Sequence, residues 1–234
     1  MANGIAGTNK SLGVIPIGSG NDFIKAIGIE RNIDEAFQTL LDPTTTLVDI
    51  GTVTLSELTI NGSATYSKIF FVNGIGIGFD AAVAERTTHI KYIKGTALYF
   101  LAVLQTLGRY KSPHYQVSVD GRTTKSRNLL IAIGNGTCAG GGFFLTPNAR
   151  PDDGLLDICS IEEIPISRIL TIMPKVMKGA HANESAVHFD RGRTIEVSSD
   201  EPVCVHADGQ IVGTKVVSIK VEVSQRSLKV LVPK

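Results

Sequence analysis

The chain has 234 residues, which is enough for one large domain or two small ones. Its 23 Lys and Arg residues against 22 Asp and Glu residues give a net charge of +1, which argues against a general nucleic-acid binder. Apolar residues make up 43% of the chain, which excludes a disordered polypeptide. Three isolated cysteines indicate reduced thiols, and the longest apolar stretch, 97–104, is too short to span a membrane. We therefore expect a cytoplasmic globular protein with no nucleic-acid partner.

The first 43 residues predict a fragment of an α/β layer. Leu12–Ile17 is a short apolar run typical of a buried strand, and a glycine-rich loop follows it. Two helices are expected next, at Phe23–Ile29 and at Ile33–Leu41. Asn32 is a suitable N-cap for the second helix.

From Thr44 onward the pattern changes to mostly strands. Asn61-Gly62 predicts a hairpin turn, and helices are expected at 81–88, at 93–107 and at 165–177. The expected strands are 47–53, 58–60, 66–72, 115–119, 128–134, 155–160, 194–198, 203–206, 216–223 and 228–232. The chain is thus predicted to be α+β and mostly β. A β-sandwich-like domain at 44–234 is expected to follow a remnant of an α/β domain at 1–43.

Glycine-rich segments carry most of the functional information. Gly18–Asp22 (GSGND) lies between a strand and a helix, where backbone N–H groups can approach a phosphate and Asp22 can hold Mg²⁺ through water. A plain strand-to-helix turn has the same pattern. Residues 71–80 (FVNGIGIGFD) indicate close strand packing with Asp80 as a helix N-cap, and they match a dinucleotide-binding motif poorly.

Two further segments contain Asp-Gly turns. Residues 134–157 combine glycines with paired carboxylates. Asp153 and nearby carbonyl groups could bind a hard cation there, or the segment could be a turn that enters a strand. Residues 208–210 (DGQ) suit an ordinary hairpin. The remaining histidines lack metal-ligand spacing and are expected on the surface or in loops, namely His89, His114, His181 and His188.

In their order along the chain, these motifs resemble the soluble bacterial diacylglycerol/lipid kinase family, which is related to sphingosine kinases and NAD kinases. The family pattern has a G-T-x-N-D loop, a V-D-x-G strand, an F-x-N-x-x-G-x-G-F-D-A segment, a glycine run before P-x-A-x-x-D-D-G-L-L-D, and a late D-G-E. The corresponding segments here are 18–22, 48–51, 71–81, 140–157 and 208–210. The resemblance covers nearly the whole chain. It implies ATP-dependent, Mg²⁺-requiring phosphorylation of a lipid hydroxyl, such as that of diacylglycerol, at the membrane surface.

The resemblance also implies roles for single residues near the nucleotide. Gly18, Ser19 and Asn21 would lie beside the ATP phosphates. Asp22 and Asp49 would belong to a network of Mg²⁺ and water that bridges these phosphates.

A second group of residues is implied farther along the chain. Arg150, Asp153 and Leu155 would form a structural Mg²⁺ site, in which Arg150 and Leu155 act through their backbone carbonyls. Gln210 occupies the position of the family's proposed general base, a glutamate. An amide cannot accept the proton of a lipid hydroxyl, so Gln210 could only hold that hydroxyl by a hydrogen bond.

Two departures leave alternatives open. The chain shows no G-G-D-G-T loop, so we expect an N-terminally shortened member with impaired activity, and position 210 lacks a carboxylate. A non-catalytic lipid-binding or interaction module is therefore the main alternative, and an NAD kinase is a third hypothesis. Apolar surface around Leu12–Ile17 would favour a homo-oligomer.

Overall fold

The computed structural model describes residues 2–18, 20–58, 64–89 and 96–234. Its helices are α1 (Ala2–Ile5), α2 (Asp22–Ala26), α3 (Ile33–Leu41), α4 (Phe79–His89), α5 (Thr96–Leu107) and α6 (Ile166–Val176). Its strands are β1 (Ser11–Leu12), β2 (Thr44–Leu58), β3 (Ala64–Phe71), β4 (Gly74–Gly78), β5 (His114–Val119), β6 (Arg122–Gly134), β7 (Leu156–Glu162), β8 (Val187–Gly192), β9 (Thr194–Ala207) and β10 (Gln210–Val232).

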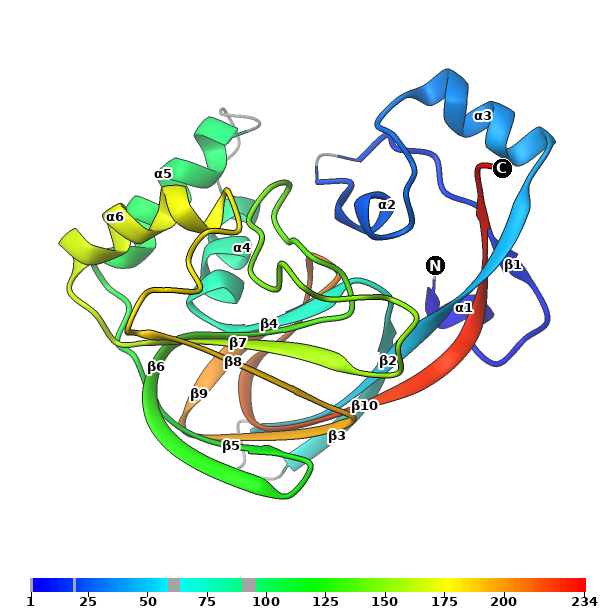
Figure 1. The fold of residues 1–234 in the computed structure, drawn as a ribbon. Helices are drawn as coiled ribbons and strands as arrows, with labels where there is room; N and C mark the ends of the chain where they lie inside the picture. The colour runs from blue at the N-terminus through cyan, green and yellow to red at the C-terminus, as the bar shows by residue number, and fades with distance from the viewer. Residues whose placement is uncertain (1, 19, 59–63, 90–95) are drawn as a thin grey trace.

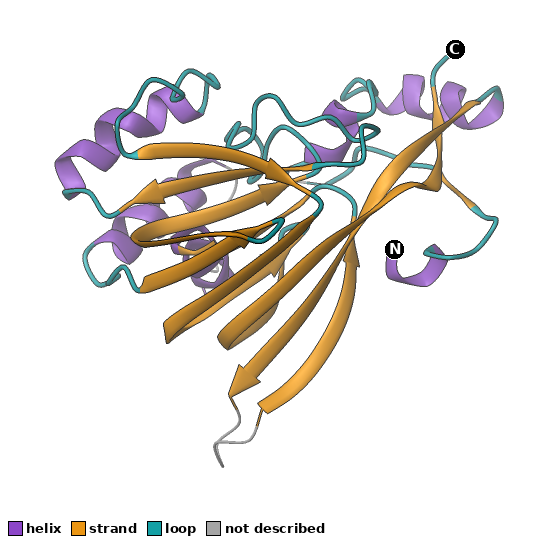
Figure 2. Ribbon diagram, turned by 60° about the horizontal axis from the view of Figure 1, so that its bottom comes forward, coloured by secondary structure: helices purple, strands orange, loops and turns teal. Residues whose placement is uncertain are grey.

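One ten-stranded sheet organises the molecule (Figures 1 and 2). Its order is β3-β2-β10-β9-β4-β6-β7-β8, and all of these neighbours pair antiparallel. β5 also pairs with both β6 and β9, so β4 and β5 lie one after the other between the same two strands. β1 pairs parallel with β10 near its end. These connections bring residues from distant parts of the chain together at the strand ends.

The two faces of the sheet are both covered. Alternate residues of β6 show this, because Ile131 and Ile133 pack inside the curved sheet while Leu130 and Ala132 face the helices. The inner core contains apolar residues of β2, β4, β5, β7, β9 and β10 as well. The outer core joins β6 and β7 to α4, α5 and α6, which lie together on one side of the sheet (Figure 1). The arrangement confirms the predicted mostly-β fold.

Residues 2–43 pack against the far end of the same sheet. Leu12, Ile24 and Ile27 form a third core with Val48 of β2 and Val230 of β10. In Figure 1, α1, α2 and α3 lie beside this extension of β2 and β10. The long strands therefore connect the N-terminal segment to the remainder of the molecule.

Helix α3 has the bounds that the sequence predicts. The Asn32 side chain accepts the backbone N–H groups of Asp34 and Glu35, at 3.0 and 3.4 Å, and both acidic residues lie at the positive end of the helix. Residues 12–17 differ from expectation, since only Ser11 and Leu12 pair as a strand. Pro16 has no N–H group to donate to a strand ladder.

Several other predicted bounds were wrong. The helix predicted at 23–29 spans Asp22–Ala26. The strand pairs predicted at 194–198 and 203–206, and at 216–223 and 228–232, are the single strands β9 and β10, which continue through register shifts. β8 was not predicted. The Asn61-Gly62 turn lies outside the described residues, although β2 and β3 pair antiparallel on either side of it.

Candidate functional site

The DGQ turn binds the start of β4. Asp208 adopts a φ of 48° between β9 and β10, and its carboxylate accepts the backbone N–H groups of residues 72–74 at 2.9 to 3.0 Å. Gln210 is the first residue of β10 and is exposed. Asp208 thus anchors the turn, and Gln210 beside it is left exposed.

Asn73 connects this turn to the loop after β6. Its carbonyl accepts the N–H groups of Asn135 and Gly136, at 2.9 and 2.8 Å, and its side-chain amide donates to the carbonyl of Cys138 at 3.0 Å. The buried Asn135 amide donates to the carbonyls of Asp49 and Val72. The motifs at 48–51, 71–81 and 134–157 therefore meet around the side chains of Asn73 and Asn135.

The Gly18–Asp22 loop lies against the glycines that follow β6. The Asp22 carboxylate accepts the N–H group of Gly141 at 2.9 Å and the Cys138 thiol at 3.2 Å, and Lys25 Nζ lies 3.4 Å from it. Burial and the neighbouring Asp22 carboxylate raise the pKa of the Cys138 thiol to about 11, so this thiol donates as S–H. A chain of contacts therefore leads from Asp22 through Cys138 and Asn73 to the DGQ turn.

Asn21 shapes the loop itself. It adopts a φ of 53°, its Oδ1 accepts the Gly18 N–H group at 3.0 Å, and its Nδ2 donates to the Gly18 carbonyl at 2.7 Å. The loop is closed by its own asparagine. Ser19, which the resemblance places beside the nucleotide, lies outside the described residues.

Asp49 is fully buried in β2 and holds a different loop. Its two carboxylate oxygens accept the N–H groups of Gly154, at 2.6 Å, and of Arg226, at 2.7 Å. Burial raises the pKa of the Asp49 carboxyl, while these two hydrogen bonds lower it. The carboxylates of Asp22 and Asp49 thus face separate loops, and only the Asp49 backbone carbonyl contacts the asparagine network.

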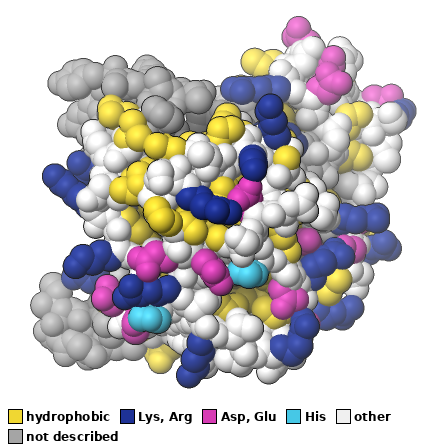
Figure 3. All heavy atoms as spheres, turned by 60° about the vertical axis from the view of Figure 1, so that its left-hand side comes forward, with side chains coloured by type: hydrophobic (Ala, Val, Ile, Leu, Met, Phe, Trp, Pro, Cys, Tyr) yellow, Lys and Arg dark blue, Asp and Glu magenta, His cyan; other side chains and the backbone are white. Residues whose placement is uncertain are grey.

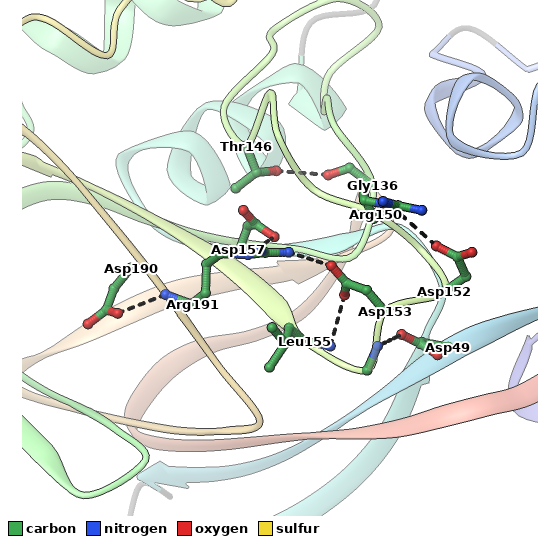
Figure 4. A network of polar contacts seen from close by, with 11 residues as sticks. Asp49, Gly136, Thr146, Arg150, Asp152, Asp153, Leu155, Asp157, Asp190 and Arg191 are labelled. Atoms are coloured by element: carbon green, nitrogen blue, oxygen red, sulfur yellow. Dashed lines mark hydrogen bonds and ion pairs between the residues drawn. The ribbon is translucent and has the colours of Figure 1, made fainter.

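The predicted structural cation site lies in the loop that Asp49 holds (Figure 4). Arg150 is exposed and lies 3.7 Å from Asp152. The Asp153 carboxylate accepts the Leu155 N–H group at 3.0 Å and forms an ion pair with Arg191. In the part of the chain that the structure describes, no group of three or more His, Cys, Asp or Glu side chains could hold a metal ion.

Sequence reasoning missed the pairing of Asp80 with His206. Asp80 is the second residue of α4, not its N-cap, and its Oδ2 lies 3.2 Å from His206 Nε2. A Cβ atom on Gly76 would lie 1.9 Å from Asp80 Oδ2, so this glycine leaves room for the pair. His181 lies in a loop, as one of the two expected alternatives, but it is fully buried beside Cys159. Only the packing of distant strands reveals these contacts.

An apolar cavity lies between the sheet and the helices. Its volume is about 70 Å³. The lining comes from α5 and α6, which supply Val103, Ile172 and Met173, and from β6 and the start of α4. Asp80 also lines it, so the cavity approaches the buried pair with His206. The two predicted apolar helices therefore border a cavity that reaches Asp80.

Two family models match the chain. Residues 1–53 match the diacylglycerol kinase catalytic domain, and residues 73–232 match the YegS C-terminal NAD kinase beta sandwich-like domain. The chain belongs to this diacylglycerol and lipid kinase family. The predicted resemblance is thereby confirmed.

Similar proteins agree with this membership. A diacylglycerol kinase of Mycobacterium tuberculosis (strain H37Rv) is 31% identical over 88% of this chain, and the chain spans 64% of that relative's length. A probable lipid kinase YegS-like of Pseudomonas aeruginosa (strain PAO1) is 33% identical over 95% of the chain and 68% of that protein. The crystal structure of a putative diacylglycerol kinase from Bacillus anthracis has the same fold, with a TM-score of 0.72 at 23% identity over 99% of this chain and 72% of that one.

Proposed function

We propose that the protein transfers the γ-phosphoryl group of ATP, bound with Mg²⁺, to the hydroxyl of a lipid alcohol such as diacylglycerol. The observation that carries this proposal is the contact network from Asp22 through Cys138 and Asn73 to the DGQ turn. It joins the loop proposed for the nucleotide to the turn proposed for the lipid hydroxyl. Phosphoryl transfer depends mainly on such positioning and on electrostatic stabilisation.

The Gly18–Asp22 loop is the proposed phosphate site. Gly18 and Asn21 precede α2 and, with Ser19, are proposed to bind the phosphates, and Asp22 is the acidic group that would hold Mg²⁺ through water. The side chain of Asp22 is 14% exposed and lies beside Lys25, which fits a carboxylate that faces a hydrated cation. Both oxygens of Asp49 already accept N–H groups, so Asp49 fits a supporting role through its charge. Mg²⁺ would supply charge neutralisation between the phosphate oxygens.

The cavity beneath α5 and α6 is the proposed entry to the lipid site. Its lining is apolar apart from Asp80, as an acyl chain requires. Outside the cavity, Ile166, Leu170 and Met177 are exposed on or next to α6. Figure 3 shows hydrophobic, basic and acidic side chains together on this side of the molecule. We propose that this side contacts the membrane surface peripherally. No helix within the described residues is long and apolar enough to cross a membrane.

Gln210 is proposed to occupy the position of the general base, where it would support a slower phosphoryl transfer than a glutamate. Its exposed side chain follows the anchored Asp208 and Gly209 turn, so it is free to hold a lipid hydroxyl. Because an amide does not take up the proton, we propose a transfer rate that is lower by about 10²–10⁴ than with a carboxylate. The structural Mg²⁺ at Arg150, Asp153 and Leu155 stays a prediction, and no step of the reaction depends on it.

A lipid-binding module without turnover is the second candidate, and Gln210 is the observation that favours it. One experiment separates the candidates. The protein is incubated with radiolabelled ATP, Mg²⁺, vesicles containing diacylglycerol, and NAD, and its binding to the vesicles is measured by sedimentation. Label in the lipid that is lost in Asp22→Asn supports the proposed reaction. Label in NAD identifies an NAD kinase, and vesicle binding without any labelled product identifies the binding module.

A further inference from the structure

Arg191 forms ion pairs with Asp153, in the loop before β7, and with Asp157, in β7 itself. It lies on β8 directly opposite Asp157 of β7 in the antiparallel register. Its Nε donates to Asp157 Oδ2 at 3.2 Å, and its terminal nitrogen forms an ion pair with Asp153 Oδ2. Figure 4 shows the guanidinium between the two carboxylates. The Arg191 guanidinium therefore connects the end of this loop to the strand that follows it.

Because the two aspartates are largely buried, they need the positive charge of the Arg191 guanidinium beside them. The side chain of Asp157 is only 8% exposed and that of Asp153 is 22% exposed. Burial raises the pKa of the Asp157 carboxyl, and the positive charge of Arg191 acts in the opposite direction. Two neighbouring carboxylates in such surroundings repel each other unless a positive charge lies between them.

The same loop leads directly to the candidate site. Asp153 Oδ1 accepts the Leu155 N–H group, and the residue between them, Gly154, has a φ of +74° and donates its N–H group to Asp49. A Cβ atom on Gly154 would lie 2.7 Å from the Gln225 side chain. Position 154 therefore needs glycine both for its positive φ and for the space beside Gln225. Arg191 thus holds the Asp153 carboxylate by an ion pair, and Asp153 holds the turn by accepting the Leu155 N–H group. The Gly154 N–H group of this turn binds the buried carboxylate of Asp49.

These contacts engage both oxygens of the one carboxylate in the predicted cation site. Mg²⁺ and Ca²⁺ bind six or more oxygen ligands. Of Arg150, Asp153 and Leu155, only Asp153 offers a carboxylate, and both of its oxygens already have partners. A guanidinium is charged at any relevant pH and presents several N–H donors in one plane, which suits a pair of carboxylates.

We infer that Arg191 supplies the positive charge of this loop in place of a structural divalent cation, and that it positions Asp49 through the Asp153-Gly154 turn. Arg191 is a positioning residue in this account, since it contacts neither substrate. The assignment replaces the structural Mg²⁺ that the family resemblance implies. It concerns the stability of the loop without any nucleotide or lipid, so it can fail while the proposed kinase reaction stands.

The test measures thermal unfolding with and without divalent cations. Wild-type protein should unfold at the same temperature, within about 1 °C, in EDTA and in millimolar Mg²⁺ or Ca²⁺. Arg191→Met should lower that temperature by about 5 °C or more in EDTA, because it leaves two partly buried carboxylates without a cation. Addition of Ca²⁺ should restore part of the loss, and Asp153→Asn in the Arg191→Met background should abolish that recovery.

Arg122→Met is the matched control, because Arg122 forms an exposed ion pair with Asp190, the residue next to Arg191. It should change the unfolding temperature by less than about 1 °C in either buffer. A wild-type unfolding temperature that rises in Mg²⁺ or Ca²⁺, and does not rise in Asp153→Asn, would overturn the inference. This comparison needs no Arg191 variant, so it decides the question even if Arg191→Met does not fold.

Discussion

Asp208 accepts three backbone N–H groups and Asp49 accepts two, so each carboxylate holds together segments that are more than 100 residues apart in the chain. Both occur in short motifs that are visible in the sequence. Their chemistry differs from the expectation, because the side chains bind backbone amides of the protein itself. A motif therefore identifies the place of a site more readily than it identifies the partner of each side chain.

Asp208→Asn should destabilise the protein by about 1.5–3 kcal/mol, since an amide replaces one charged acceptor oxygen with a donor facing backbone N–H groups. Urea unfolding followed by circular dichroism measures the change. Asp42→Asn is the control, because Asp42 is exposed and forms an exposed ion pair with Lys234 near the C-terminus. Equal effects of the two substitutions would show that the Asp208 contacts contribute nothing particular.

His181 should make the protein sensitive to acid. Burial lowers the pKa of its imidazole in the folded state, whereas the unfolded chain binds a proton near pH 6.5. The unfolded state therefore takes up more protons below that pH, and stability should fall as the pH drops from about 6.5. Unfolding temperatures between pH 7.5 and 5.5 measure the slope. His181→Gln should reduce this slope and the exposed His188→Gln should not; an unchanged slope in His181→Gln would refute the assignment.

At the scale of elements, the longer helices were predicted more accurately than the long strands, although the short helix α1 was not predicted. The bounds of helix α3 were predicted correctly because its N-cap and its periodicity are local signals. The prediction divided β9 and β10 into two strands each. The exposed polar residues in the middle of each strand resemble turns in the sequence, whereas in the structure the strands continue through register shifts. β8 was missed altogether, and with it the pairing of Arg191 with Asp157, which exists only through the β7–β8 register. Contacts of this kind depend on tertiary pairing that no local pattern contains.

Filling the cavity beneath α5 should block lipid uptake. Val103 is 2% exposed and lines the cavity, so Val103→Phe would place a ring where we propose an acyl chain. Binding of a fluorescent diacylglycerol should weaken at least about tenfold, with little loss of stability because the site has free volume. Val223→Phe, on β10 away from the cavity, is the control. Unchanged lipid affinity in Val103→Phe would exclude this cavity as the acyl site.

At the scale of the whole molecule, the largest exposed apolar side chains of residues 2–58 lie at its N-terminal end. Ile33, Phe37 and Leu41 recur every four residues on α3 and are all exposed, and Ile17 is exposed nearby in the chain. Leu12, which was expected to contribute, is buried. Within the predicted segment 12–17, Ile17 is the large apolar residue that is exposed, and the exposed apolar stripe of this end of the molecule lies on α3.

This surface should promote self-association. Light scattering after size-exclusion chromatography should show a dimer or larger species at high protein concentration. Phe37→Glu should shift the protein toward the monomer, because it places a charge in the middle of the apolar stripe. Phe189→Glu changes an exposed phenylalanine on β8 and should have no such effect. A wild-type protein that is monomeric at every concentration would contradict the prediction.

The central claim is that this fold catalyses lipid phosphorylation with Gln210 at the position of the base. The most direct measurement compares the initial rate of phosphate transfer to diacylglycerol by wild-type protein and by Gln210→Glu, with Gln116→Glu on the exposed face of β5 as the control. The account predicts slow transfer by wild-type protein, a rate about 10²–10⁴ higher for Gln210→Glu, and no gain for Gln116→Glu. Equal rates for wild-type protein and Gln210→Glu would contradict it.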